Sequence, residues 1–283
     1  MVKSPFNKTF PVTVFYLPKL DLIFVGYDNG CIVIFDGKSR EKKSIIRGCH
    51  HIKKIQVIYN NKLDKHLLVA ACNQGEKSHL LFWKITKNSN HNVDYSSTDL
   101  KQFEFNSQIS DLYTTDIFIE SINKENRVLI CPLMDDSFKL LYNLFEHEIV
   151  ELHFNKDHLN MNGGISSMSF DQDKEGINDL ALSGMLNGKF QVYNLSNGTL
   201  QKTIKAEKHN SIECIAFDGA LMNVCIGGSE GNVSIYNIEN QEPILVKCIE
   251  NCHDGFITAI AQCENFFTTG SQDGTIKVLD KVS

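Results

Sequence analysis

A hairpin frame recurs along the chain, and its clearest copy runs from Gly270 to Asp280. Gly270 ends a short apolar strand, the dipeptide at 273–274 (Asp-Gly) suits a tight turn that needs positive φ, and residues 275–279 alternate apolar with polar. Three further copies keep the spacing of the two glycines and of the pair that follows: Gly26 and Gly30 with Phe35-Asp36, Gly184 and Gly188 with Tyr193-Asn194, Gly227 and Gly231 with Tyr236-Asn237. The frame therefore predicts repeated antiparallel units.

The repeat length decides the architecture that we predict. Self-similarity at a period of roughly 40 to 45 residues is typical of propeller blades. We predict an all-β fold, a β-propeller of four-stranded antiparallel blades, as a single domain over residues 1–283. Six blades are visible, and seven is the alternative. The predicted blades span residues 11–46, 52–105, 109–143, 165–204, 211–247 and 256–280. Within them, residues 109–113 should be a first strand and residues 87–98 a mobile loop.

Composition is that of an ordinary globular protein, with 42% hydrophobic and 22% charged residues. Nine cysteines, an odd number and several at alternate strand positions, indicate reduced thiols in an intracellular protein. The start of the chain lacks the apolar run of a signal peptide, and no stretch is long and apolar enough to span a bilayer. We expect a cytoplasmic or nuclear protein. A net charge of −6 makes nucleic acid an unlikely partner.

The repeats resemble the WD-repeat β-propeller family over essentially the whole chain. Histidines stand before first strands (His209, His253 and one of His50 or His51), and aspartates stand in the turns between second and third strands (Asp28 and Asp273). The third strands end in a pair that takes the place of the family's Trp-Asp: Phe35-Asp36, Trp83-Lys84, Tyr142-Asn143, Tyr193-Asn194, Tyr236-Asn237 and Leu279-Asp280. In the last repeat Leu279 replaces the tryptophan, so the family's buried His-Ser/Thr-Trp-Asp network should be incomplete there.

This resemblance implies a non-enzymatic scaffold that mediates protein–protein interactions within a eukaryotic multiprotein complex, with no cofactor. The partner stays open because a fold does not specify a function. One alternative is a propeller-type enzyme that uses paired carboxylates of raised pKa in the central channel. Another is a propeller that binds phosphoinositides or nucleic acid, for which the sequence offers one arginine, Arg47, where a paired-arginine loop would be needed.

Two groups of residues could be interpreted as a metal site or as catalytic acids, but the sequence favours neither interpretation. Cys49-His50-His51 and Cys252-His253 place soft metal ligands side by side, but neither has a second pair at ligand spacing, so we predict no metal site. Asp28 and the pair Asp135-Asp136 could be imagined as catalytic acids, yet no Ser-His-Asp grouping or glycine-rich phosphate cradle accompanies them. We therefore predict no catalytic residues.

Partner contacts are expected on the loops that precede the first strands and on the turns between second and third strands, all on one face. Met185 and Leu186 should be exposed apolar residues beside a glycine turn, which marks a contact patch. The predicted partner-binding residues are Tyr27, Asp28, His50, Met185, Leu186, His209, Ser229, Glu230, His253 and Gln272.

The sixth repeat stops at its third strand, because only three residues follow Asp280. Its outer strand must therefore come from elsewhere. We favour a weak latch formed by the N-terminal segment 2–10, which contains Pro5 and so lacks one ladder donor. The alternative is that the edge after Lys277 takes a strand from a partner by β-augmentation.

Overall fold

The structure is a computed structural model that describes residues 9–48, 51–60, 64–87, 93–97, 103–119, 124–135, 137–145, 149–152, 163–170, 180–263 and 265–281. These residues form strands joined by turns and loops, with no helix among them, so the predicted all-β class is confirmed. Correspondingly, no helix in these ranges is long and apolar enough to cross a membrane.

The strands of the first half of the chain form three sheets. The first sheet contains β1 (Pro11–Leu17), β2 (Leu22–Tyr27), β3 (Cys31–Asp36) and β4 (Lys42–Arg47). The second contains β5 (His51–Asn60), β6 (Lys65–Gln74), β7 (Lys77–Lys87), β8 (Val93–Ser97) and β9 (Phe103–Phe105). The third contains β10 (Tyr113–Ile119), β11 (Lys124–Pro132), β12 (Phe138–Tyr142) and β13 (Val150–Leu152).

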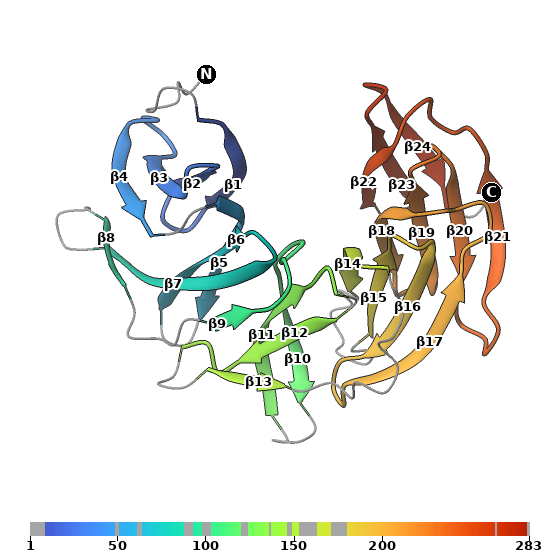
Figure 1. Ribbon diagram of the computed structural model, residues 1–283, viewed down its shortest axis with the longest axis horizontal. Coiled ribbons are helices and arrows are strands. Elements are labelled where there is room, and N and C mark those ends of the chain that lie inside the picture. The colour runs from blue at the N-terminus through green and yellow to red at the C-terminus, as the bar shows by residue number, and fades with distance from the viewer. Residues whose placement is uncertain are drawn as a thin grey trace. The chain divides into compact units, whose positions relative to one another are not determined.

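The second half forms three more sheets (Figure 1). The fourth contains β14 (Ile165–Phe170), β15 (Leu180–Met185), β16 (Lys189–Asn194) and β17 (Thr199–Lys205). The fifth contains β18 (Ile212–Asp218), β19 (Asn223–Gly228), β20 (Val233–Asn237) and β21 (Ile244–Ile249). The sixth contains β22 (Ile257–Gln262), β23 (Phe266–Ser271) and β24 (Ile276–Asp280).

The chain divides into two compact units, and the division runs through the third sheet. Unit 1 comprises residues 1–114, 128–131 and 140–151, and unit 2 comprises residues 115–127, 132–139 and 152–283. The first and second sheets thus belong to unit 1, and the fourth, fifth and sixth to unit 2. The single domain over residues 1–283 stays a prediction.

The four glycine hairpins form as the sequence predicts. They join β2 to β3, β15 to β16, β19 to β20 and β23 to β24, in antiparallel register. The second glycine of each copy has positive φ, between 71° at Gly188 and 80° at Gly30 and Gly274. Only glycine adopts this conformation at low cost, which is why the spacing of the two glycines repeats.

Within each unit, adjacent sheets pack face to face, so the core consists of apolar layers between sheets. In unit 1 one layer joins the first and second sheets around Phe24, Ile34 and Ile55. In unit 2 one layer joins the fourth and fifth sheets, and another joins the fifth and sixth. Figure 1 shows the fourth, fifth and sixth sheets side by side in this order. A buried ion pair, Lys281 Nζ to Asp218 Oδ2 at 2.5 Å, fixes the end of the sixth sheet to the fifth.

Three details differ from the predicted strands. Residues 109–113 are not the first strand of the third sheet, which begins at Tyr113. Within the predicted mobile loop 87–98, residues 93–97 form β8 and pair with β7, and the remaining part, 88–92 and 98, lies outside the described residues. Because β9 also pairs with β7, the second sheet has five strands.

The cysteines are mostly reduced. Seven are free thiols, five of them buried, whereas Cys72 is disulfide-bonded. Burial raises the pKa of Cys214 to about 12, so this thiol stays protonated at neutral pH. The expected reduced state therefore holds for these seven cysteines and is wrong for Cys72.

Candidate functional site

The predicted partner-binding residues occupy the turns and loops that the sequence indicates, but only some of them are accessible. Leu186 and Gln272 are exposed, and Asp28, Ser229 and Glu230 are half-buried. Asp28 also holds the chain before β1, because its carboxylate accepts a hydrogen bond from the Phe10 N–H at 3.0 Å. His50 lies outside the described residues.

Met185 and Tyr27 are buried, so the expected exposure of Met185 is wrong, and the role of both residues in partner contacts stays a prediction. Met185 is fully buried and Tyr27 is 3% exposed. Each ends the second strand of its sheet and pairs with a residue of the first strand just before a bulge, at Ile165 and Pro11 respectively. The bulge breaks the alternation of inward and outward side chains, and both residues are directed into the core.

His209 and His253 are also buried, and both serve the fold. His209 Nε2 lies 2.9 Å from Ser234 Oγ on β20. His253 Nε2 lies 2.8 Å from Thr269 Oγ1 on β23, and its Nδ1 lies 2.9 Å from Thr275 Oγ1. These bonds tie the loop before a first strand to the sheet behind it, so neither imidazole is available to a partner.

The carboxylate of Asp273 completes this network in the sixth sheet. It accepts from the Thr275 hydroxyl at 2.7 Å and from the Asp254 N–H at 3.0 Å, and it lies 3.1 Å from His253 Nδ1. These bonds, the one from the Thr275 hydroxyl above all, hold the pKa of Asp273 well below its ordinary value. The predicted incompleteness is therefore limited to Leu279, which packs in the apolar layer between the fifth and sixth sheets.

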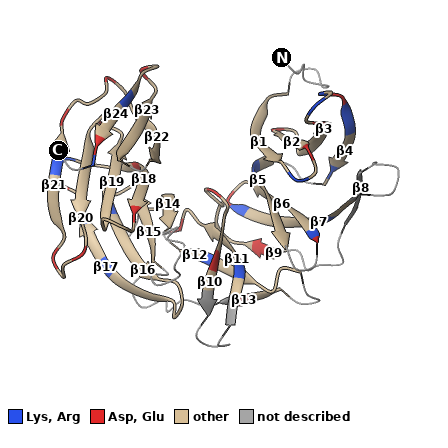
Figure 2. Ribbon diagram, turned by 180° about the vertical axis from the view of Figure 1, so that it is seen from behind, with Lys and Arg blue, Asp and Glu red and all other residues tan. Residues whose placement is uncertain are grey.

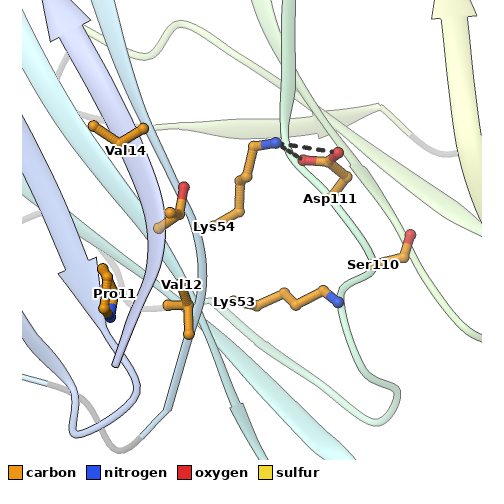
Figure 3. Close-up of a pocket in the computed structure, with 8 residues that line it drawn as sticks. Pro11, Val12, Val14, Lys53, Lys54, Ser110 and Asp111 are labelled. Atoms are coloured by element: carbon orange, nitrogen blue, oxygen red, sulfur yellow. Dashed lines mark hydrogen bonds and ion pairs between the residues drawn. The ribbon is translucent and has the colours of Figure 1, made fainter. Parts of the chain in front are cut away.

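A cavity of about 600 Å³ lies in unit 1 between β1, β5 and the segment before β10. In Figure 3, Lys53 and Lys54 extend from β5 toward Ser110 and Asp111. Lys54 Nζ lies 3.0 Å from Asp111 Oδ1, so one lysine is paired and the other, Lys53, is exposed. With two lysines and one aspartate the cavity has a single surplus positive charge, which suits at most a small acidic group.

Nothing in the described residues favours the alternative functions. No group of three or more His, Cys, Asp or Glu side chains in these ranges could hold a metal ion. The carboxyls with a resolved pKa shift have lowered values, whereas an acid–base pair needs a raised one. Figure 2 shows the basic residues scattered over many strands, with the most continuous stretch along β4 and the turn before it.

The most distinctive surface belongs to the sixth sheet. Residues that pair across its three strands share one face, because paired side chains lie on the same side of an antiparallel sheet. We call this surface the uncovered face, and it consists of Ala259, Ala261, Phe266, Thr268, Gly270, Ile276, Val278 and Asp280. Ile276 is 75% exposed and Val278 is 61% exposed. The opposite face, with Phe267 and Leu279, packs on the fifth sheet.

The fifth sheet shows what the same positions do when another sheet covers them. Val233 and Ile235 stand at the positions of Ile276 and Val278, and they are 1% and 2% exposed. They are buried because β22 and β23 of the sixth sheet pack on them. The sixth sheet also lacks an outer strand in the described residues, so the edge of β24 is unpaired there.

The sequence indicated the open edge of β24 but not the uncovered face. Ile276, Val278 and Gly270 read as ordinary members of a hairpin, since burial of a strand face depends on the neighbouring sheet.

Comparisons with known proteins agree with this geometry. Residues 246–280 match the family model "WD domain, G-beta repeat", which covers β24 and its hairpin. A chain in a crystal structure of the mitotic checkpoint complex superposes with a TM-score of 0.65 at 14% identity, covering 98% of this chain and 76% of that one. The β-propeller domain of Cps50 (Swd1) from Myceliophteria thermophila has a TM-score of 0.62 at 12% identity, with coverages of 95% and 86%. The fold of this chain is a β-propeller, and residues 246–280 are similar to a WD repeat.

No curated protein matches the sequence, so no relative transfers an activity to this β-propeller. At these identities the structural neighbours show the fold alone. Function has to be argued from the surfaces.

Proposed function

We propose that this β-propeller is a non-enzymatic WD-repeat scaffold that mediates protein–protein interactions within a multiprotein complex. The observation that carries the proposal is the uncovered face of the sixth sheet. Soluble proteins seldom leave a contiguous apolar sheet surface open to water unless it contacts another molecule. One structural neighbour is itself a chain of a multiprotein complex, which supports the same reading.

The chemistry of the uncovered face favours a protein partner. β22 and β23 contain no charged residue, and β24 adds only Lys277 and Asp280. An apolar surface next to an unpaired strand edge offers both contact area and backbone hydrogen bonds, and β-sheet additions use these two contributions. A phosphate-bearing ligand would find no basic group on this face.

Affinity purification of the tagged full chain from its native cells tests the scaffold function. The double variant Ile276→Asp with Val278→Asp should reduce every protein that binds through this face by at least about tenfold, because the partner would have to bury two carboxylates. Both side chains are exposed, so the variant should keep the melting temperature of the unaltered chain.

The matched control is Ile244→Asp with Val246→Asp on β21. These side chains are also apolar and exposed, at 55% and 50%, but they lie on an outer strand that is already paired. The control should retain its partners. The scaffold proposal is wrong if no protein co-purifies with the unaltered chain, and the uncovered face is not its contact if both double variants capture the same proteins equally well.

The turns that contain Leu186, Ser229, Glu230 and Gln272 are proposed as a second contact surface within unit 2. Leu186→Asp alone is the appropriate probe, because Met185 is buried and its replacement would disturb folding.

We further propose that the protein acts in the cytoplasm or the nucleus. Latching of the sixth sheet by the N-terminal segment stays a prediction, since residues 1–8 lie outside the described residues.

A further inference from the structure

The turn between β19 and β20 corresponds to the turn between β23 and β24, and each lies against a histidine of the loop before its sheet. Glu230 stands in the fifth sheet at the position of Asp273 in the sixth. In both turns the carboxylate accepts a hydrogen bond from the N–H that follows the histidine (His209 or His253), at 3.3 Å and 3.0 Å respectively. The two sites therefore share this backbone contact and differ in their side chains.

The imidazole of His209 lacks a bond that the imidazole of His253 makes. Nε2 of His209 lies 2.9 Å from a serine hydroxyl on β20, but its Nδ1 forms no hydrogen bond with any of the described residues. Nδ1 of His253, by contrast, lies 2.9 Å and 3.1 Å from two oxygens of its turn. At the threonine position of that turn the fifth sheet has Asn232, whose side-chain N–H donates instead to the Lys208 carbonyl at 2.8 Å. A buried nitrogen without a partner is costly, so a further ligand is expected there.

A second buried polar atom lies beside the same place. Glu230 Oε2 also forms no hydrogen bond within the described part of the chain, although Oε1 of the same carboxylate is bonded. A methyl group built on Gly228 would lie 2.5 Å from His209 Nδ1, 2.9 Å from the Ser211 carbonyl oxygen and 3.0 Å from Glu230 Oε2, its three nearest neighbours. We call the space between these three atoms and Gly228 the polar niche.

In the sixth sheet a hydroxyl group stands where the fifth sheet has the polar niche. Ser271 occupies the position of Gly228. Its Oγ donates to the Gly255 carbonyl at 3.1 Å and accepts from the Asp273 N–H at 3.2 Å. Glycine at position 228 supplies no such oxygen. A water molecule can both donate and accept, so it can take the place of this hydroxyl.

We infer that the polar niche binds one water molecule, which connects the loop before β18 to the turn between β19 and β20. Buried waters typically make about three hydrogen bonds to polar groups, and the niche offers three. The water fixes the turn that carries Ser229 and Glu230, two residues of the proposed second contact surface. The inference itself does not depend on the scaffold function, because all of its contacts lie inside unit 2.

The hydrogen-bonding capacity of the three groups determines how the water is oriented. The Ser211 carbonyl and the Glu230 carboxylate can only accept, so they take both hydrogens of the water. The water oxygen must then accept from His209, whose proton is therefore on Nδ1. Nε2 is left as an acceptor for the Ser234 hydroxyl, which lies 2.9 Å away.

Both ionisable groups have the charge that this arrangement needs at neutral pH. Burial lowers the pKa of His209 against the opposing charge of Glu230, and Lys205 adds to the lowering, so the imidazole is neutral. Burial alone would raise the pKa of Glu230, but hydrogen bonds from Ser229 and Asn210 hold it below its ordinary value, so the carboxylate is ionised.

The position of the imidazole proton provides the first test, by ¹⁵N NMR of the histidine-labelled full chain at pH 7. His209 should carry its proton on Nδ1, because the water accepts there. A cation in the niche would need the lone pair of Nδ1 and would move the proton to Nε2. A proton on Nε2 of His209 would therefore overturn the inference.

A crystal structure of the full chain provides the second test. It should show one density peak within about 2.7 to 3.2 Å of His209 Nδ1, the Ser211 carbonyl oxygen and Glu230 Oε2. A niche without a peak would overturn the inference, as would a direct bond between His209 Nδ1 and Glu230 Oε2. A peak that rubidium ions replace in soaked crystals would show a cation and would overturn it as well.

Alanine at two glycines provides the matched comparison. Gly228→Ala places a methyl group in the niche, so the peak should disappear from its crystal structure. Gly270→Ala is the control, because a methyl group built there has nothing within 4 Å, and its structure should keep the peak. A peak that persists in Gly228→Ala would overturn the inference. If Gly228→Ala does not fold, the proton position and the peak in the unaltered chain still decide it.

Discussion

At the scale of single residues, the buried histidines show how the loops of this propeller are held. The imidazole of His253 joins a hydroxyl of β23 to the hydroxyl and carboxylate of the following turn. A polar side chain in the core is tolerated only when its hydrogen bonds are made. The histidine that the sequence suggested as a contact residue is thus a structural element.

Removal of the Thr269 hydroxyl should reveal this role. Thr269→Val keeps the shape of the side chain but leaves His253 Nε2 without its partner in a buried site, which should lower the free energy of unfolding by about 1 to 3 kcal/mol. The matched control, Thr258→Val, changes an exposed threonine of the neighbouring strand and should be close to neutral. Urea denaturation measures both, and equal stabilities would contradict the structural role.

Acid should weaken the same network through Asp273. Its pKa is lower in the folded chain than its ordinary value of 3.8, so its contribution is complete above that value and disappears as the pH falls further. Asp273→Asn should lower the stability at pH 7 and flatten the loss of stability between about pH 5 and pH 2. Thermal unfolding across this range measures the effect, and parallel pH profiles for the two proteins would contradict it.

Predictions about single residues were correct where the backbone conformation of the residue itself determines the structure. The glycines of the hairpin turns need positive φ, and their spacing located four hairpins. The expected exposure of Met185 was wrong, because the bulge opposite this residue turns its side chain inward. A bulge depends on how two strands pair, so the sequence of either strand alone does not reveal it.

At the scale of elements, the burial of a strand face depends on the sheet that follows it. β20 and β24 have nearly the same alternation of residues, but only β20 is covered on both sides. Burial by a neighbouring segment also explains why the predicted start of the third sheet, at Ile109, is wrong. Ile109 is fully buried and looked like part of a strand, yet its N–H and C=O bond to the side chain of Asn73 and not to a neighbouring strand.

Truncation of one isoleucine on β20 and one on β24 should show this difference in burial. Ile235→Ala should cost about 2 to 5 kcal/mol of unfolding free energy, because the layer between the fifth and sixth sheets would contain a cavity. Ile276→Ala should change the stability by less than about 0.5 kcal/mol, because that side chain is 75% exposed. Similar losses for both variants would mean that the uncovered face is covered in solution.

At the scale of the whole molecule, the fold is a β-propeller, and its sixth sheet has three strands among the described residues. The sequence indicated six blades, with seven as the alternative, and a sixth blade whose outer strand has to come from elsewhere, because both follow from counting strands. It could not predict that Ile276 and Val278 on one face of this sheet are exposed, because exposure depends on what packs against the sheet in space. The scaffold function is inferred from this face.

Hydrogen exchange of β24 tests the account most directly, with β20 as the internal reference. The chain is measured alone and in the complex purified from its native cells. Alone, the amides of β24 should exchange faster than those of β20, because no outer strand among the described residues pairs with β24 and Ile276 and Val278 are exposed. In the complex they should slow by at least about tenfold, while β20 stays unchanged. Slow exchange of β24 in the isolated chain, or fast exchange that persists in the complex, would contradict the account.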